Sequence, residues 1–284
     1  MWKAITYRFL KSKSILMLLS GVALLSSCED VIEVAVPSEE PRLIIDAMVR
    51  VDTTQAITTV RVKVSETASF FDEPQPVTLE QITLAGAILL EETPGSGIYS
   101  REVSTSQLMR EELFLAIDYN DQIFAAFTDF APAVPIDNLS QGPGGLIDDE
   151  TELVIGFTDI PDSENFYLLD FDLNEFVTTR DQFYEGQEFE FSFFYDDKLE
   201  PGTELEISLM GATSDFYQYM EKLLEQSDDD LGVFDTPAVT VRGNILNASD
   251  IETISDLSDA NLETNFPLGY FAVVQEYKQT IVIQ

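Results

Sequence analysis

Short apolar blocks separated by turn residues constrain the fold of this 284-residue chain more than any other feature. In residues 59–64, Thr-Val-Arg-Val-Lys-Val, the valines fall on one face and the polar side chains on the other, as a half-buried strand requires. Similar blocks precede Pro132, at residues 42–51, 58–66, 77–90, 112–119 and 122–130. Many short strands at this spacing predict a mainly β chain with sandwich-like packing rather than an α/β fold.

The second half of the chain continues the strand pattern. Phe189, Phe191 and Phe193 alternate with polar residues, and we interpret this stripe as sandwich core rather than as a ligand platform. Strands are predicted here at residues 152–157, 165–172, 188–195, 204–210, 238–242, 270–274 and 278–283.

One helix is predicted, over residues 214–226, and no convincing helix is expected before Pro132. Ser214 is expected to cap it, and Asp215 lies in the first turn, where the helix dipole favours an anion. The apolar side chains that share one face of this helix are Phe216, Tyr219, Met220 and Leu223.

Proline and glycine concentrate between the two halves, and residues 132–147 are therefore predicted to be a linker. This boundary divides the chain into two β-sandwich-like domains. We expect an immunoglobulin-like sandwich over residues 42–131. The second β domain is expected over residues 148–284 and contains the helix at 214–226.

Residues 1–27 have the organisation of a bacterial lipoprotein signal peptide. A basic region without acids is followed by an apolar run at 15–25, which is too short to span a bilayer comfortably. The next residues, Leu-Ser-Ser-Cys, resemble a lipobox, so we expect cleavage between Ser27 and Cys28 and lipidation of Cys28. The alternatives are an uncleaved anchor and an ordinary signal with a chance cysteine. Residues 28–41 are expected to form a tether.

The mature chain would be strongly acidic. Removal of the signal leaves 257 residues with 11 basic and 52 acidic side chains, a net charge of −41. Such a charge argues against nucleic acid or an anionic membrane surface as a partner, because phosphate-rich surfaces attract lysine and arginine.

The absence of histidine and the single cysteine exclude most catalytic machinery. This chain cannot form a Ser-His-Asp triad, a Cys-His dyad, a His/Cys zinc site or an iron–sulfur cluster by itself. A carboxylate-pair hydrolase is the enzyme class that composition leaves open. However, the mature chain lacks the tryptophan usual in glycosidase clefts, since Trp2 leaves with the signal. We therefore expect a protein that is not an enzyme.

Two acidic groups supply oxygen ligands of the kind that Ca²⁺ prefers. Neither group follows the EF-hand spacing, and consecutive aspartates point in different directions, so solvated loops without a cofactor are the expected state. The calcium candidates are Asp228, Asp229 and Asp230 in one group and Asp159, Asp162 and Glu164 in the other.

Two short motifs concern export and modification. Glu29-Asp30, directly after Cys28, resembles the acidic signal by which Bacteroidota send lipoproteins to the outer face of the outer membrane. Residues 52–54, Asp-Thr-Thr, resemble a Bacteroidota O-glycosylation motif, which makes Thr53 a candidate acceptor, with a simple turn as the alternative.

Several stretches, taken in order, resemble the Bacteroidota lipoprotein family known as domain of unknown function 4249. They are residues 28–32 (CEDVI), 40–45 (EPRLII), 159–161 (DIP), 165–167 (NFY), 195–197 (YDD), 216–219 (FYQY), 241–245 (VRGNI) and 268–271 (LGYF). Gly243 and Gly269 are expected to allow tight entry into strands, and Tyr270 and Phe271 to pack in the core.

The resemblance offers no catalytic residues, and it implies a surface lipoprotein, often encoded beside TonB-dependent outer-membrane transporters. We therefore expect a non-enzymatic lipoprotein on the exterior of the outer membrane, acting as an accessory of such a transporter in nutrient uptake. An adhesin or glycan-binding module is the second hypothesis, and a carboxylate-based hydrolase is the third.

Overall fold

β-Strands make up most of the computed structural model, which describes residues 41–68, 73–144, 150–196, 198–227, 240–249, 251 and 266–284. The prediction of a mainly β chain is therefore confirmed. Cys28, Ser27 and the run from Asp228 to Asp230 lie outside the described residues.

The elements are numbered along the chain. The strands are β1 (Leu43–Val51), β2 (Ile57–Glu66), β3 (Gln75–Pro76), β4 (Gln81–Leu84), β5 (Ala87–Ile88), β6 (Leu90–Glu91), β7 (Ile98–Ser104), β8 (Leu113–Tyr119), β9 (Gln122–Thr128), β10 (Phe130–Ala131), β11 (Ile136–Gln141), β12 (Thr151–Thr158), β13 (Phe166–Asp170), β14 (Phe176–Arg180), β15 (Glu188–Tyr195), β16 (Glu204–Ala212), β17 (Leu246–Asn247) and β18 (Leu268–Val282). The helical segments are α2 (Thr105–Leu108), the 3₁₀ turn η1 (Asp181–Phe183) and α3 (Ser214–Ser227).

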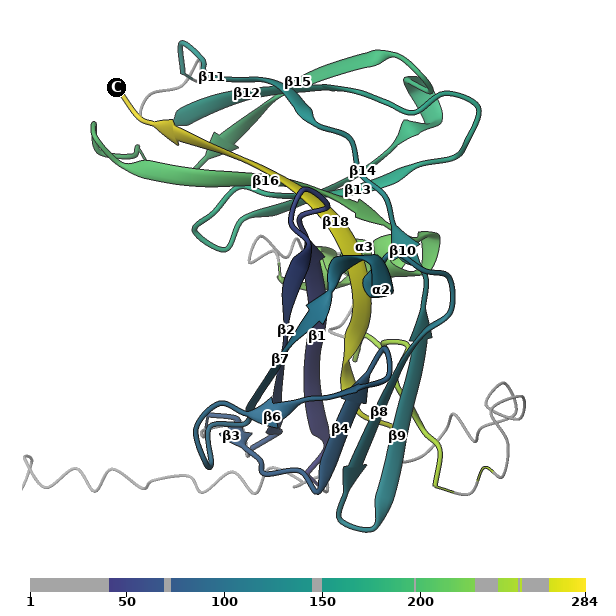
Figure 1. Ribbon diagram of the computed structural model, residues 1–284. Coiled ribbons are helices and arrows are strands. Elements are labelled where there is room, and N and C mark those ends of the chain that lie inside the picture. Colours follow the sequence, from purple (N-terminus) through teal and green to yellow (C-terminus); the bar gives the residue numbers. More distant parts are fainter. Residues whose placement is uncertain are drawn as a thin grey trace, which may run out of the picture. The chain divides into compact units, whose positions relative to one another are not determined.

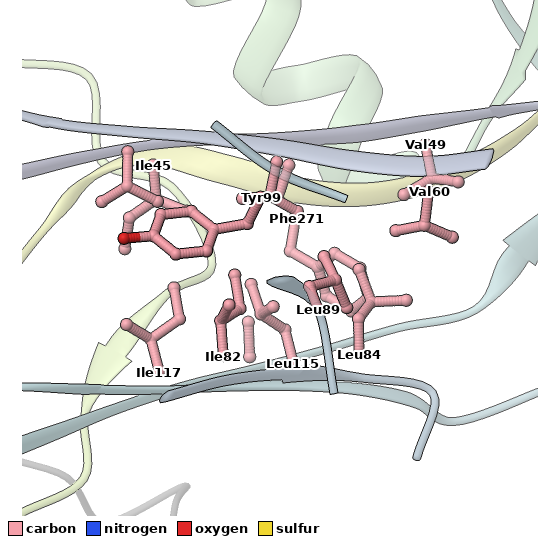
Figure 2. Close-up of a cluster of buried hydrophobic side chains, with 14 of the residues drawn as sticks. Ile45, Val49, Val60, Ile82, Leu84, Leu89, Tyr99, Leu115, Ile117 and Phe271 are labelled. Carbon is pink, nitrogen blue, oxygen red and sulfur yellow. The ribbon is translucent and has the colours of Figure 1, made fainter. Parts of the chain in front are cut away.

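The first core lies between two packed sheets, in agreement with the predicted sandwich-like packing. One sheet contains β18, β1, β2, β7 and β6 in that order, and the facing sheet runs β17-β9-β8-β4-β5. Figure 2 shows side chains from the two sheets pointing at one another, with Ile45, Val60 and Phe271 on one side and Ile82 and Leu115 on the other. The alternation predicted for residues 59–64 is confirmed, because all three of its valines are buried.

The second core lies between the sheet β14-β13-β16-β18 and the sheet β11-β12-β15. Phe189, Phe191 and Phe193 pack against this core from β15, so their interpretation as sandwich core is confirmed. Aromatic rings meet repeatedly here: Phe171 stacks on Phe193 at 4.1 Å between centroids, and Tyr184 stacks on Phe189 at the same separation.

Strand β18 belongs to both halves. Its residues 268–275 pair in parallel with β1, from Ile44↔Leu268 to Val51↔Gln275, and its residues 276–282 pair antiparallel with β16. Figure 1 shows β18 (yellow) lying beside β1 and then beside β16. The sequence predicted two separate strands here, at 270–274 and 278–283, which was wrong because the polar residues between them also pair in the sheet.

The polar side chains in the middle of β18 have hydrogen-bond partners at the point where the strand passes from one half to the other. The buried Gln275 donates to the hydroxyl oxygen of Thr53 at 2.9 Å and accepts from the backbone N–H of Ala133 at 3.1 Å. The buried Glu276 accepts a hydrogen bond at 3.1 Å from Arg50.

Arg50 also forms an ion pair at 2.8 Å with Asp170. Burial alone would lower the pKa of Arg50, but hydrogen bonds and charge from Asp170 and Glu276 raise it. A polar gap between two apolar runs is thus compatible with one continuous strand.

Helix α3 packs on the opposite face of the shared sheet. Phe216 and Met220 join Met210, Tyr270 and Val274 in a third cluster, so the predicted helix and its apolar face are confirmed. The cap is one residue earlier than predicted, since the hydroxyl of Thr213, not Ser214, accepts from the N–H of Phe216 at 3.2 Å. Among the described residues, no helix is both long enough and apolar enough to span a membrane.

The predicted boundaries need correction in two places. Residues 40–284 form one compact unit, and the predicted linker at 132–147 contains strand β11, which pairs with β12. The first core is completed by Ile245 and by β18 from the end of the chain, so it is not formed by residues 42–131 alone. Local composition could not reveal these distant contributions.

Several smaller elements also differ from the predictions. Strands β7 and β14 and the helical turn α2 were missed, and the apolar block at 77–90 is divided among β4, β5 and β6. Of the strand predicted at 238–242, residues 240–242 are irregular.

We predict that Gly269→Ala destabilises the protein by about 3 kcal/mol, since a Cβ would overlap the Ile45 carbonyl oxygen at a φ of +97°. Gly202→Ala is the matched control, because Gly202 has a φ of +93° and open space around its Cβ position. It should cost only about 1 kcal/mol. Urea unfolding of both variants measures the difference, and equal losses would contradict the proposed overlap.

Candidate functional site

A polar groove lies along α3, where segments distant in the sequence meet. Two adjoining cavities form it, of about 670 and 620 Å³, and both are lined by Asp215, Asn244 and Tyr270. We call it the α3 groove. The first cavity is also lined by Glu112, Phe127, Thr128, Asp129 and Thr213, and the second by Gln218, Tyr219, Lys222, Gln226, Thr240, Val241, Arg242 and Gly243.

Two glycines allow the groove's backbone segments to touch. A Cβ at Gly243 would overlap the carbonyl oxygen of Gly269, and a Cβ at Gly269 would overlap that of Ile45. Residues 240–244 therefore lie directly against the start of β18, which itself lies against β1. The prediction that these glycines permit tight strand entry is confirmed.

Asn244 fixes the floor of the groove. Its amide donates to the carbonyl oxygens of Phe127 at 3.0 Å and Phe271 at 2.9 Å, and its side-chain oxygen accepts from the N–H of Phe271 at 2.9 Å. One side chain thus bridges β9 and β18 in the way that a short strand would.

Aromatic rings form the inner wall. Tyr270 packs against Phe216 at 5.0 Å and Tyr219 at 4.8 Å between centroids, and Tyr270 and Phe271 are buried as predicted. Burial, and then the charge of Asp215, raises the pKa of Tyr270. The pKa of Tyr219 is also raised by burial. Both phenols therefore stay neutral near pH 7.

Charge is divided along the groove. Among the described residues, the first cavity is lined by the carboxylates of Glu112, Asp129 and Asp215 and by no basic side chain, and all three acidic residues are exposed. The second cavity is lined by Lys222 and Arg242, with Asp215 at the junction. Of the described lining residues, the basic ones therefore belong to the second cavity only.

A cation–π contact holds Arg242 in place. Its guanidinium lies 4.4 Å from the ring centroid of Phe266, and the guanidinium of Arg42 lies 4.7 Å from the same centroid. This stack connects the basic end of the groove to the start of β1.

The three predicted calcium ligands that the structure describes, Asp159, Asp162 and Glu164, are not brought together. Asp159 is buried, and its carboxylate accepts from the Tyr167 hydroxyl at 2.5 Å and the Gly186 N–H at 2.8 Å, so both its oxygens already have protein donors. Asp162 and Glu164 lie together beside a separate cavity that Asp159 does not line. In the ranges that the structure describes, no three acidic, histidine or cysteine side chains are arranged to hold a metal ion.

Thr53 lies in the turn after β1 and is half-buried. Its hydroxyl oxygen accepts the hydrogen bond from Gln275, while Asp52 accepts from the N–H of Thr54 at 2.9 Å. Its glycosylation stays a prediction.

Sequence reasoning identified part of the groove but gave it a different role. Gln218, Arg242 and Tyr270 belong to stretches that carried the family resemblance, and they were interpreted as structural. Glu112 and Asp129 were missed altogether. The backbone N–H of Glu112 donates to the carboxylate of Asp129 at 2.7 Å. No local sequence pattern indicates this contact.

The groove is an open, polar surface. Charged, amide and aromatic side chains line an open surface of the size usual for small ligands. Catalytic general acids in glycosidases are usually set against apolar groups, whereas the three carboxylates here are exposed.

Comparison with known proteins gives a family without an assigned activity. A family model described as a domain of unknown function (DUF4249) matches residues 29–254. A search of curated proteins finds no match.

We predict that Asn244→Ala lowers the free energy of unfolding by about 2 kcal/mol, because it leaves backbone groups of β9 and β18 without partners. Asn138→Ala is the control, since the Asn138 amide donates only to the exposed Glu190. Its effect should stay within about 0.5 kcal/mol. Chemical denaturation checks both, and an equally mild loss at Asn244 would refute the bridging role.

Proposed function

The chain belongs to the DUF4249 family of unknown function, and from this premise we propose that it is a lipid-anchored, non-enzymatic binding protein of the outer-membrane surface. We further propose that it serves as an accessory of a TonB-dependent transporter in nutrient uptake. The α3 groove is the binding site in this proposal.

The α3 groove is the observation that carries the proposal. One polar surface is formed by three segments that are distant from one another in the sequence: α3, residues 240–244 and the start of β18. The apolar side chains of α3 pack against Tyr270 in the third cluster, and the polar side chains of the same helix line the groove. A surface with exposed charges and a fixed floor suits capture and release of a polar solute.

The anchoring part of the proposal rests on the N-terminal sequence. Cys28 follows a lipobox-like sequence, and the tether 28–41 can span at most roughly 50 Å when extended. β1 begins directly after the tether and runs parallel to β18 toward the second core. The α3 groove would then lie within reach of a partner in the same membrane.

Glycan binding is the second candidate function, and one observation favours it. Phe127 lines the acidic end of the groove and stays 37% exposed, although it packs against Phe114 at 4.8 Å. An exposed ring beside amide and carboxylate groups is a feature that sugar sites use. A glycan array discriminates this candidate from the transporter accessory.

Affinity purification of the full-length lipoprotein from mildly solubilised outer membranes tests the partnership. We expect a β-barrel transporter to co-purify in stoichiometric amount. Recovery of the protein alone, or its location in the inner membrane, would overturn the proposal.

We predict that Cys28→Ser moves the protein from the membrane fraction to the soluble fraction and abolishes labelling by a radioactive fatty acid, because no other cysteine exists to carry the anchor. Ser26→Ala is the control and should leave both readouts unchanged. Continued acylation of the Cys28→Ser protein would refute the anchor.

A further inference from the structure

We propose that strand β15 is a docking edge for a partner protein, which adds an extended segment of about eight residues as a further strand of the sheet. Apolar side chains of that segment would alternate with lysine or arginine. The inference goes beyond the proposed function, because it concerns the edge of the second core and not the α3 groove.

β15 differs from the other sheet edges in the described part of the chain. The edge strands β5, β6 and β17 have only two residues each. β14 has five residues and packs against α3, and β11 has a register shift between Ile136 and Asn138. Short length and local irregularity protect an edge from pairing with another chain. β15 instead has eight residues in unbroken register with β12, without proline or glycine, and is the edge best suited to accept a further strand.

The backbone of β15 offers hydrogen bonds along this edge. In an antiparallel pair, every second residue exchanges N–H and C=O bonds with the neighbouring strand, and the residues between them point these groups away from it. β12 lies on one side of β15 (Figure 1), and among the described strands none pairs with the other side. A partner's strand would bind to the backbone groups on that side.

The second core is incompletely covered at β15. Leu153, Ile155 and Phe157 on the central strand β12 are fully buried. Their direct neighbours on β15 are the three phenylalanines of the stripe, which pack against the same core but are only half-buried. Inward side chains of an added strand would lie beside these rings and remove more of their apolar surface from water. The partner's inward positions are therefore expected to be apolar.

The outward face of β15 determines the polarity of the other positions. Glu188, Glu190 and Ser192 are exposed on this face. Glu190 accepts a hydrogen bond at 3.0 Å from the amide of Asn138, which holds its side chain on the outward face. Opposite charges at paired positions of neighbouring strands stabilise the pair, and like charges destabilise it. Lysine or arginine is therefore expected at the partner's outward positions.

A second copy of this chain is a poorer occupant of the edge. Each mature copy would carry 52 acidic side chains against 11 basic ones. Such a charge opposes association of identical chains, whereas it attracts a segment that carries lysine or arginine.

Fluorescence anisotropy of a labelled octapeptide tests the proposal, with the full-length lipoprotein in detergent at physiological salt. The peptide has blocked termini and contains lysine and valine at alternate positions. A peptide of the same composition, with its lysines and valines in two separate blocks, is the control for unspecific attraction to an acidic protein. We expect the alternating peptide to bind about tenfold more tightly, because only this peptide has one apolar and one basic face as a strand.

Backbone methylation shows whether the peptide binds as a strand. In an extended peptide, the amides of the valines lie along one edge and those of the lysines along the other. N-methylation of one set should therefore weaken binding about tenfold, and N-methylation of the other set should leave the affinity unchanged. Equal effects of the two methylations would contradict pairing with β15.

Charge reversal on β15 tests the outward positions. The double variant Glu188→Lys, Glu190→Lys should weaken the lysine–valine peptide about fivefold and strengthen a peptide with glutamate in place of lysine. The double variant Glu73→Lys, Glu102→Lys is the charge-matched control, at exposed positions away from β15, and should leave both affinities unchanged.

Equal affinities for the alternating peptide and the two-block peptide, or equal effects of the two double variants, would overturn the proposal. Sedimentation velocity gives a further test. A dimer of the wild-type protein that the Glu188→Lys, Glu190→Lys protein does not form would also overturn it, because β15 would then pair with a second copy of the chain.

Discussion

The pairing of β18 with β1 on one edge and β16 on the other is the interaction on which the rest of this structure depends. Eight residues of β18 register with β1, and the following seven register with β16. Both cores therefore share a strand at the end of the chain. The first sandwich-like half is not complete until residues more than 200 positions apart have paired, because Ile45 and Phe271 lie in the same core.

The same strand explains how the α3 groove is positioned. Alternate residues of β18 point to opposite faces, so Phe271 enters the first core while Tyr270 supports α3. Asn244 then binds the backbone beside Phe271 and holds residues 240–244 at the edge of the helix. The groove is thus built on sheet and helix, which hold its side chains more firmly than loops alone would.

The basic residues of this acidic chain differ in what they contact. In a chain with so few basic residues, the position of each one is informative about function. Arg50 is used for structure, because it pairs with Asp170 and Glu276 between the two halves. Arg242 lies against the ring of Phe266 and, together with Lys222, lines the second cavity of the groove.

The sequence by itself determined the strand-rich class, the helix over α3, the facing of the valines in β2 and the close approach at Gly243 and Gly269. These features depend on local periodicity and on residue type, which a sequence displays directly. Only the tertiary structure decided that 132–147 contains a strand, that two predicted strands are one, and that Glu112 and Asp129 share a groove with Asp215. Those outcomes depend on hydrogen bonds and packing between distant segments, for which local patterns carry no information.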